Sequence, residues 1–350
     1  MKVAVVSLNN LERNGESYFG LDLVKGLRRS GIVSDFIAVN HFGRASKHDL
    51  QEEATYIRIK EMEKLNDYDF VIFNSGKFKG NYEKYDFSKI KKRKGIVLHN
   101  ESSFKSYNLE ELNRALQPDV VFSNDHAITN FYGKEANVLP LPFDLEKPKV
   151  THSRLNRIIV PTRFTFSKYI QNVAEVFKNL NLKYATHFYG KKDFYYYTIK
   201  NYFEPSWNYV LNEPFSSDVE KTEVYKNAIL AVDGSDFKIL GERIQIVQLE
   251  CFHHGVVPCM KRRWFNSFFK EGENGVALED VNGIRRVLAD EDYRNNIISN
   301  NRKLLKKYDC KVCAEKVLSV LEEECKWISV KSARKILKRW AYGKNIVQSV

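Results

Sequence analysis

Short apolar runs alternate with helical patterns along most of this 350-residue chain, and this alternation restricts the fold more than any other feature. A helical pattern at residues 17–29 separates the first two of these runs. Strands are predicted at residues 3–8, 32–39, 70–74, 95–98, 120–123 and 137–141. Short β-branched runs of this kind are typical of parallel strands that are buried on both faces. Residues 1–150 therefore predict a doubly wound α/β domain.

A second series of strands and helices follows residues 145–156, a polar stretch with Pro148 that we interpret as a linker. Further strands are predicted at residues 157–160, 184–189, 229–232, 256–260 and near 275–277. Helices are predicted at residues 169–179, 245–254, 282–288, 293–306 and from 312 onward. Residues 151–325 therefore predict a second doubly wound domain, and residues 326–350 a separate C-terminal helix. In such sheets ligands collect at the carboxyl ends of the strands.

Composition excludes several classes of protein. Hydrophobic residues make up 43% of the chain, which is enough to bury two cores and argues against disorder. No apolar run approaches the roughly 20 residues that a membrane span needs, and the N-terminus resembles a strand more than a signal peptide. The five cysteines are odd in number and all follow residue 250, which favours a reducing compartment. Cys310 and Cys313 form a lone C-x-x-C pair, which we expect to be buried structural thiols, the alternatives being redox or metal roles.

The net charge of +12 is unevenly distributed, because residues 301–350 carry +8 of it. Residues 326–344 predict a basic amphipathic helix, which can dock on its own protein, on a phosphate backbone or on an anionic membrane. Two smaller basic clusters lie at residues 89–94 and 261–263. Each is either a solvated loop or a contact for an anion.

The most specific motif is a pair of carboxylates, Glu242 and Glu250, followed by Gly255 and Pro258. The motif resembles the E-x7-E signature of retaining glycosyltransferases with the GT-B fold, which have two Rossmann-like domains facing a central cleft. The resemblance implies that Glu242, at the end of a loop, is a catalytic residue facing the donor sugar. It also implies that Glu250, two helical turns further on, accepts hydrogen bonds from the ribose of the nucleotide. The alternative is a pair of ordinary helix carboxylates.

A second motif follows the first strand of the second domain. Arg163 and Lys168 are five residues apart, like the two cations with which retaining GT-B enzymes bind the donor diphosphate. Two cations suit that position because negative charge builds on the leaving diphosphate as the glycosidic bond breaks. Backbone amides near Leu240 and Gly241, at a helix N-terminus, complete the predicted diphosphate site.

The first domain carries further candidates at the carboxyl ends of its strands. His99 directly follows the predicted strand at residues 95–98, and the resemblance implies that it faces the donor sugar. Glu101 is then a candidate for holding the acceptor. Gly15 lies in a turn that resembles the glycine-containing first loop of the GT-B fold, which approaches the donor closely because glycine lacks a Cβ.

Among GT-B enzymes, the chain is most similar to the T-even phage DNA α-glucosyltransferases. The similarity runs through the strand ending at His99, residues 119–126, the Arg163–Lys168 pair and the segment around Glu250. It implies retaining transfer from a UDP-sugar to a hydroxymethylated pyrimidine of double-stranded DNA, without a metal or a cofactor, in the cytoplasm of a phage-infected host. The base would have to leave the stack to be modified. The predicted phosphate contacts come from the two basic clusters, through Lys91, Lys92, Arg93, Arg262 and Arg263.

Two other functions remain open at this point. E-x7-E motifs also occur in GT-B enzymes that build cell-envelope glycans or glycolipids, and the C-terminal helix would suit a peripheral membrane protein equally well. A non-catalytic GT-B-like binding protein is disfavoured, because both carboxylates and both cations of the motifs are present. Neither the sugar, nor the choice between hydroxymethylcytosine and hydroxymethyluracil, nor the oligomeric state follows from the sequence.

Overall fold

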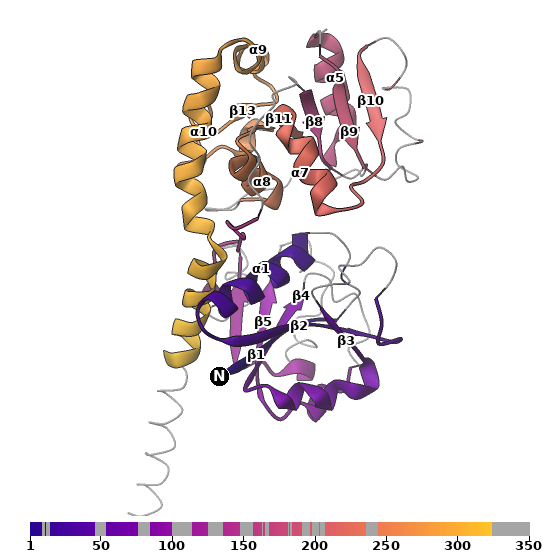
Figure 1. The fold of residues 1–350 in the computed structure, drawn as a ribbon, viewed down its shortest axis with the longest axis vertical. Helices are drawn as coiled ribbons and strands as arrows, with labels where there is room; N and C mark the ends of the chain where they lie inside the picture. Colours follow the sequence, from indigo (N-terminus) through magenta and orange to yellow (C-terminus); the bar gives the residue numbers. More distant parts are fainter. Residues whose placement is uncertain are drawn as a thin grey trace, which may run out of the picture.

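The computed structural model contains two parallel β-sheets, one in each half of the chain (Figure 1). It describes residues 1–8, 11, 15–45, 54–75, 85–99, 114–124, 136–147, 157–162, 164, 168–180, 182, 184–190, 197, 203, 207–235 and 244–323. The strands of the first sheet are β1 (Lys2–Ser7), β2 (Val33–Asn40), β3 (Thr55–Arg58), β4 (Phe70–Ser75), β5 (Arg93–Leu98), β6 (Val120–Ser123) and β7 (Asn137–Val138). Those of the second are β8 (Arg157–Val160), β9 (Thr186–Tyr189), β10 (Tyr209–Asn212), β11 (Ala228–Asp233), β12 (Val257–Met260) and β13 (Val276–Ala277).

The two sheets have the same topology. The order is β3-β2-β1-β4-β5-β6-β7 in the first and β10-β9-β8-β11-β12-β13 in the second. In each sheet, the chain adds its first strands towards one side and its later strands towards the other. This change of winding lies between β1 and β4 in the first sheet and between β8 and β11 in the second. Ligands of doubly wound folds bind outside the carboxyl ends of the strands at such switch points. The prediction of two Rossmann-like domains is confirmed, although β3 and β10, which add an outer strand to each sheet, were not predicted.

The described helices cover the sheets and link the two halves. They are α1 (Gly15–Arg29), α5 (Ile170–Leu180), α7 (Asp218–Lys226), α8 (Ile246–His254), α9 (Val281–Ala289) and α10 (Glu291–Leu305). Helix α7 was not predicted. The 3-10 segments named for the described residues are Ile59–Asp67, Phe87–Lys89, Arg262–Trp264 and Lys306–Tyr308, and a further helix begins at residue 310. Among the described helices, none is long and apolar enough to cross a membrane.

Helix α10 and the helix after it run alongside both domains (Figure 1). The chain returns to the first domain at Cys310, whose backbone N–H donates to the Phe143 carbonyl at 2.9 Å. Cys310 also packs closely on α1. A Cβ on Gly26 of α1 would lie 2.0 Å from the carbonyl oxygen of Cys310, so only glycine allows this approach. Residues 310–323 thus already pack on the first domain. The predicted basic helix at residues 326–350 lies outside the described residues, so its docking remains a prediction.

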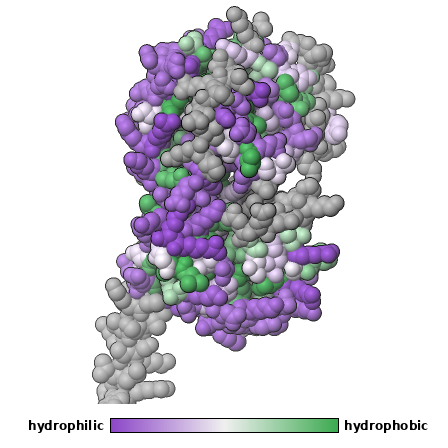
Figure 2. Space-filling view, viewed as in Figure 1, coloured by the Kyte–Doolittle hydropathy of each residue, from purple (hydrophilic) through white to green (hydrophobic). Residues whose placement is uncertain are grey.

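The apolar core continues from one half of the chain to the other. One buried cluster joins Phe19 and Leu23 of α1 to Leu249 and Phe252 of α8, and it also includes Val317 of the last helix. Figure 2 shows mainly hydrophilic residues on one face of the molecule, with apolar residues scattered among them. The two halves are therefore joined by packed side chains as well as by the chain itself.

Candidate functional site

Lys168 lies at the switch point of the second sheet, as its position after β8 predicts. Its Nζ donates to Asp233 Oδ2 at 3.1 Å and to Ser235 Oγ at 2.7 Å, both at the carboxyl end of β11. Gly234 makes this arrangement possible, because a Cβ there would lie 2.7 Å from the carbonyl oxygen of Lys168. Asp233 and Ser235 are buried and were missed by the sequence analysis. An Asp-Gly-Ser run directly after a buried apolar strand is the signal that could have found them.

The residue after Lys168, Tyr169, has a strained backbone and contacts a second cation, Lys261. Tyr169 has a φ of +44°, in the left-handed region that a bulky side chain rarely adopts. Lys261, which follows β12, places its Nζ 4.1 Å from the centre of the Tyr169 ring. Strained residues of this kind cluster at binding and active sites. Two lysines from different strands thus approach the same edge of the sheet, where they favour an anionic ligand.

Glu250 lies on α8 with both of its carboxylate oxygens engaged by α7. Lys221 Nζ bonds Glu250 Oε1, and the Tyr225 hydroxyl donates to Oε2 at 3.1 Å. Burial, with a further contribution from the Glu250 charge, raises the pKa of Tyr225 well above its usual range, so the phenol stays a donor. Neither Lys221 nor Tyr225 was identified from the sequence, because α7 itself was not.

His99 lies at the carboxyl end of β5, as predicted, but it is buried and bonded within its own domain. Its Nε2 lies 2.5 Å from Asn74 Oδ1, and the Asn74 amide nitrogen donates to the carbonyl of Glu16. Since Asn74 therefore presents its oxygen to the ring, Nε2 carries the proton. The Asn124 amide group lies beside the other ring nitrogen, with 3.4 Å between its nitrogen and Nδ1. Contacts on both ring nitrogens hold the imidazole of His99 in one orientation.

The N-termini of α1 and α8 meet between the two domains. A Cβ on Gly15, the first residue of α1, would lie 3.6 Å from Ile246 Cδ1, which is ordinary contact. The space at Gly15 therefore does not itself require glycine. Each helix follows the loop at the switch point of its own sheet. Helix N-termini carry partial positive charge and unpaired N–H groups, so this junction suits a negatively charged group.

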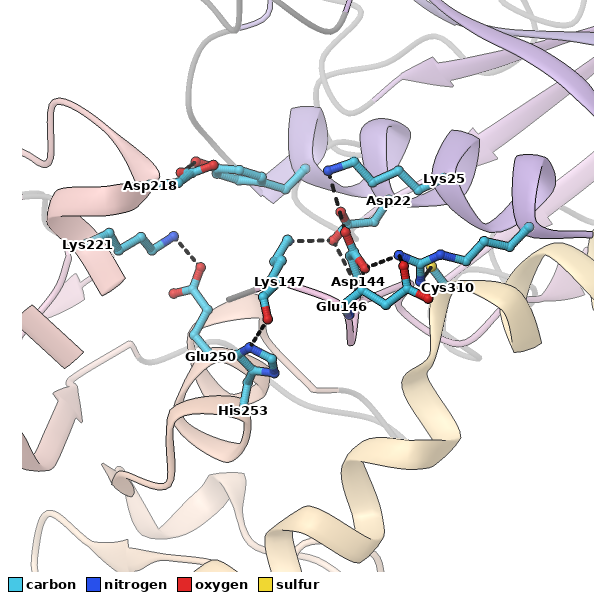
Figure 3. Close-up of polar contacts among 12 residues, drawn as sticks. Asp22, Lys25, Asp144, Glu146, Lys147, Asp218, Lys221, Glu250, His253 and Cys310 are labelled. Carbon is cyan, nitrogen blue, oxygen red and sulfur yellow. Dashed lines mark hydrogen bonds and ion pairs between the residues drawn. The ribbon is translucent and has the colours of Figure 1, made fainter. Parts of the chain in front are cut away.

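Side chains of both domains also form a polar network beside this junction (Figure 3). Lys147 lies at its centre: Nζ bonds Asp22 Oδ2 of α1 at 2.9 Å, while the Lys147 carbonyl lies 3.1 Å from His253 Nε2 of α8. Asp144 receives Arg29 at 2.5 Å and Lys25 at 3.5 Å. The segment that leaves the first domain is thus held between α1 and α8.

The remaining predicted site residues fall into two groups. Glu101, Arg163, Leu240, Gly241 and Glu242 lie outside the described residues, so their roles remain predictions. The others are described, and they lie in the two basic clusters.

The basic clusters differ in position from the predicted site. Lys91, Lys92 and Arg93 precede or begin β5, so they lie at the opposite edge of the sheet from His99, about 20 Å away at ~3.3 Å per residue. Arg262 is exposed, and its NH2 group bonds Glu271 Oε1 at 3.1 Å. Arg263 is also exposed. The structure thus brings Lys261, rather than Arg262, towards Lys168.

The cysteines of the described residues are all free and buried: Cys251, Cys259, Cys310 and Cys313. Burial raises the pKa of Cys310 to about 12, although the Arg29 guanidinium beside it acts in the opposite direction. Both thiols of the C-x-x-C pair therefore pack as small apolar groups between the last helix and α1. In the part of the chain that the structure describes, no three His, Cys, Asp or Glu side chains are grouped to hold a metal ion.

In sequence, no protein-family model and no curated protein matches this chain. In structure, it resembles the T4 α-glucosyltransferase in complex with UDP and a 13-mer DNA containing a HMU base, with a TM-score of 0.75 and 16% identity over 92% of this chain and 99% of that one. It also resembles Anabaena Alr3699/HepE in complex with UDP and glucose, with a TM-score of 0.70 and 13% identity over 92% of this chain and 100% of that one. These likenesses show that the chain has the GT-B fold.

Proposed function

We propose that this protein is a retaining glycosyltransferase that moves a sugar from a UDP-sugar to a hydroxymethylated pyrimidine of double-stranded DNA. The observation that carries the proposal is that residues of both donor-binding motifs lie where this fold binds ligands. Lys168 lies at the switch point of the second sheet, and Glu250 lies on α8, whose N-terminus is at the domain junction. The solved structures that share the fold hold UDP or UDP-glucose. The proposed domains are residues 1–150 and 151–325, with residues 326–350 as a basic helix.

The proposed donor site combines described residues with neighbours known only from the sequence. Lys168 and Arg163 neutralise the diphosphate, together with amides near Leu240 and Gly241. Glu250 binds the ribose, and Glu242 the sugar. Lys168 is already bonded to Asp233, so the diphosphate would compete with that carboxylate for the ammonium. The pairing of Lys168 with Asp233 balances the charge of both groups and limits the cost of burying a cation.

His99 is proposed to act on the sugar from the first domain. Contacts with Asn74 at Nε2 and with Asn124 at Nδ1 hold the ring in one orientation. Its ring also packs edge-on to Phe19 at 4.6 Å. We propose that His99 shapes the sugar pocket and that the leaving phosphate takes the acceptor proton. Glu101 remains the proposed acceptor residue.

The DNA acceptor is proposed because the T4 α-glucosyltransferase structures, with TM-scores of 0.70 or higher, include complexes with DNA. The phosphate contacts we propose are Arg263 and Lys261, since Lys91, Lys92 and Arg93 lie at the far edge of their sheet. Arg262 would first have to leave Glu271. A DNA acceptor of this kind would place the enzyme in the cytoplasm of an infected host cell.

The test is transfer itself. The protein is incubated with several UDP-sugars and two duplexes, one plain and one carrying 5-hydroxymethylpyrimidines, and the nucleosides are analysed by mass spectrometry. We expect a hexose or pentose to be added to the modified duplex alone, and Arg163→Ala to lower that rate by several orders of magnitude. Release of UDP without any DNA product would refute the acceptor and favour an envelope glycan. No reaction or binding with any UDP-sugar would refute the proposed function as a whole.

A further inference from the structure

Glu250 is held by two side chains from a single helix. Lys221 and Tyr225 are four residues apart on α7, so they lie on the same face of the helix, and both reach the carboxylate on α8. Figure 3 shows Lys221 beside Glu250. Lys221 bonds Oε1, and the Tyr225 hydroxyl donates to Oε2. The Glu250 side chain is 12% exposed and the Lys221 side chain 18% exposed, so water screens this pair only weakly.

The two contacts fix the carboxylate without saturating it. An ionised carboxylate has about four acceptor positions on its two oxygens. Lys221 and Tyr225 occupy one position on each oxygen, so each oxygen can still accept a hydroxyl. Two neighbouring hydroxyls, such as the 2′ and 3′ groups of a ribose, match that remaining capacity. Without the Lys221 ammonium, the partly buried carboxylate would lose its ion-pair partner and one of the two contacts that orient it.

The same lysine also contacts the other domain. Lys221 Nζ lies 4.8 Å from the centre of the Tyr18 ring of α1, and the Tyr18 hydroxyl donates to Asp218 Oδ1 of α7 at 2.6 Å. Tyr18 is buried, and Lys147 Nζ also lies near its ring, 5.4 Å from the ring centre. The ammonium that holds Glu250 is therefore itself held against an aromatic ring of the first domain.

We infer that Lys221 and Tyr225 are positioning residues for Glu250 and that Tyr18 makes their arrangement depend on the contact between the two domains. The inference rests on the proposed function, because it assigns Glu250 to the ribose of the donor. The inference predicts a selectivity among nucleotides. Lys221 and Tyr225 orient Glu250 to accept hydrogen bonds from the ribose hydroxyls. Loss of either residue therefore weakens the binding of nucleotides that carry both hydroxyls more than the binding of nucleotides that lack one.

The experiment measures the dissociation constants of UDP and 2′-deoxy-UDP by calorimetry on the full chain. We expect the wild type to prefer UDP by about tenfold or more, since a lost hydrogen bond to a charged group commonly costs that much. Lys221→Met and Glu250→Gln should each bring the ratio of the two constants close to one. Lys226→Met, on the same helix, should leave the ratio unchanged, as should Glu223→Gln.

Tyr225→Phe and Tyr18→Phe extend the test with substitutions that keep the aromatic ring. Tyr225→Phe removes the donor to Glu250 Oε2 and should lower the ratio in part, and Lys221→Arg should restore most of what Lys221→Met loses. Tyr18→Phe removes the hydroxyl that donates to Asp218 and should lower the ratio less than Tyr225→Phe does.

The outcomes separate this inference from the proposed function. If the wild type binds neither nucleotide, the proposed function fails and the inference with it. If the wild type prefers UDP but Lys221→Met weakens the binding of both nucleotides equally, then α7 only supports the fold. That result refutes the positioning role and leaves the proposed function standing.

Discussion

Replacing Lys147 by methionine should make the stability of the protein depend on pH through a single buried carboxylate, Asp22. Asp22 is 1% exposed, and its Oδ2 receives the Lys147 ammonium at 2.9 Å. The backbone N–H of Asp144 also donates to that oxygen, at 3.3 Å, while Oδ1 has no hydrogen-bond partner in the described structure. Lys147→Met therefore leaves a buried negative charge with only a weak backbone contact.

Removing one partner of a buried ion pair costs about 3–5 kcal/mol. The Lys147 side chain is 27% exposed, so water already screens part of the interaction, and we expect a loss of about 2–4 kcal/mol at neutral pH. Burial raises the pKa of Asp22 even in the presence of Lys147. Its folded-state pKa therefore lies above its unfolded value, so the destabilisation caused by Asp22 is smallest below about pH 4, where Asp22 is protonated in both states. The variant loses up to ~1.4 kcal/mol per pH unit as pH rises towards the folded-state pKa.

Urea unfolding of the wild type, Lys147→Met and the double variant Asp22→Asn/Lys147→Met, between pH 4 and pH 8, checks this reasoning. The gap between Lys147→Met and the wild type should widen with rising pH, and the double variant should lose most of that pH dependence. A gap below about 0.5 kcal/mol that stays constant over this range would refute the claim that Lys147 compensates a buried charge.

Three further predictions concern other contacts. Gly26→Ala forces a Cβ against the Cys310 backbone, so overpacking of about 1–3 kcal/mol should outweigh the roughly 1 kcal/mol that alanine gains in a helix. In thermal unfolding, this variant should have a lower Tm than Gly15→Ala on the same helix, and equal Tm values would contradict the close approach. Arg29 holds the pKa of Asp144 below its usual value against the opposing effect of burial, so the stability that Asp144→Asn removes should be present above about pH 4 and disappear as pH falls further; a difference in unfolding free energy that persists at pH 2 would count against it. Asn74→Ala removes the acceptor of His99 Nε2 and should lower sugar transfer by about tenfold or more while changing the UDP dissociation constant little; an unchanged transfer rate would remove His99 orientation from the mechanism.

Sequence patterns predicted the strands that lie at the centre of each sheet, because these are short, apolar and buried on both faces. The strand β10 and the helix α7 were missed for a physical reason. Strand β10 is partly exposed at the edge of its sheet, and α7 buries only Val224 and Tyr225, so neither shows a strong apolar period. A start signal for α7 was present, since the Ser217 hydroxyl caps the helix by accepting from the Glu220 N–H.

Functional side chains that come shortly after a strand could be predicted from the sequence. Their hydrogen-bond and ion-pair partners from other strands and helices could not. His99 directly follows β5 and Lys168 lies in the loop after β8, as their positions in the sequence indicate, but their partners follow other strands and are 25 to 67 residues away in the chain. No local pattern could pair Lys221 with Glu250, because these residues belong to different helices. The position of Arg93 could have been inferred, since it precedes the same strand that His99 follows.

The proposed donor site is tested most directly by titrating UDP into the wild type and two lysine variants. Lys168 lies at the switch point of the second sheet, whereas Lys178 is exposed on the neighbouring helix α5. We predict that the wild type and Lys178→Met bind UDP equally well and that Lys168→Met binds it about 10–100-fold more weakly, as expected for the loss of a charged contact to phosphate. Equal affinity in all three proteins, or no binding of UDP to the wild type, would contradict the assignment of this edge to a nucleotide-sugar donor.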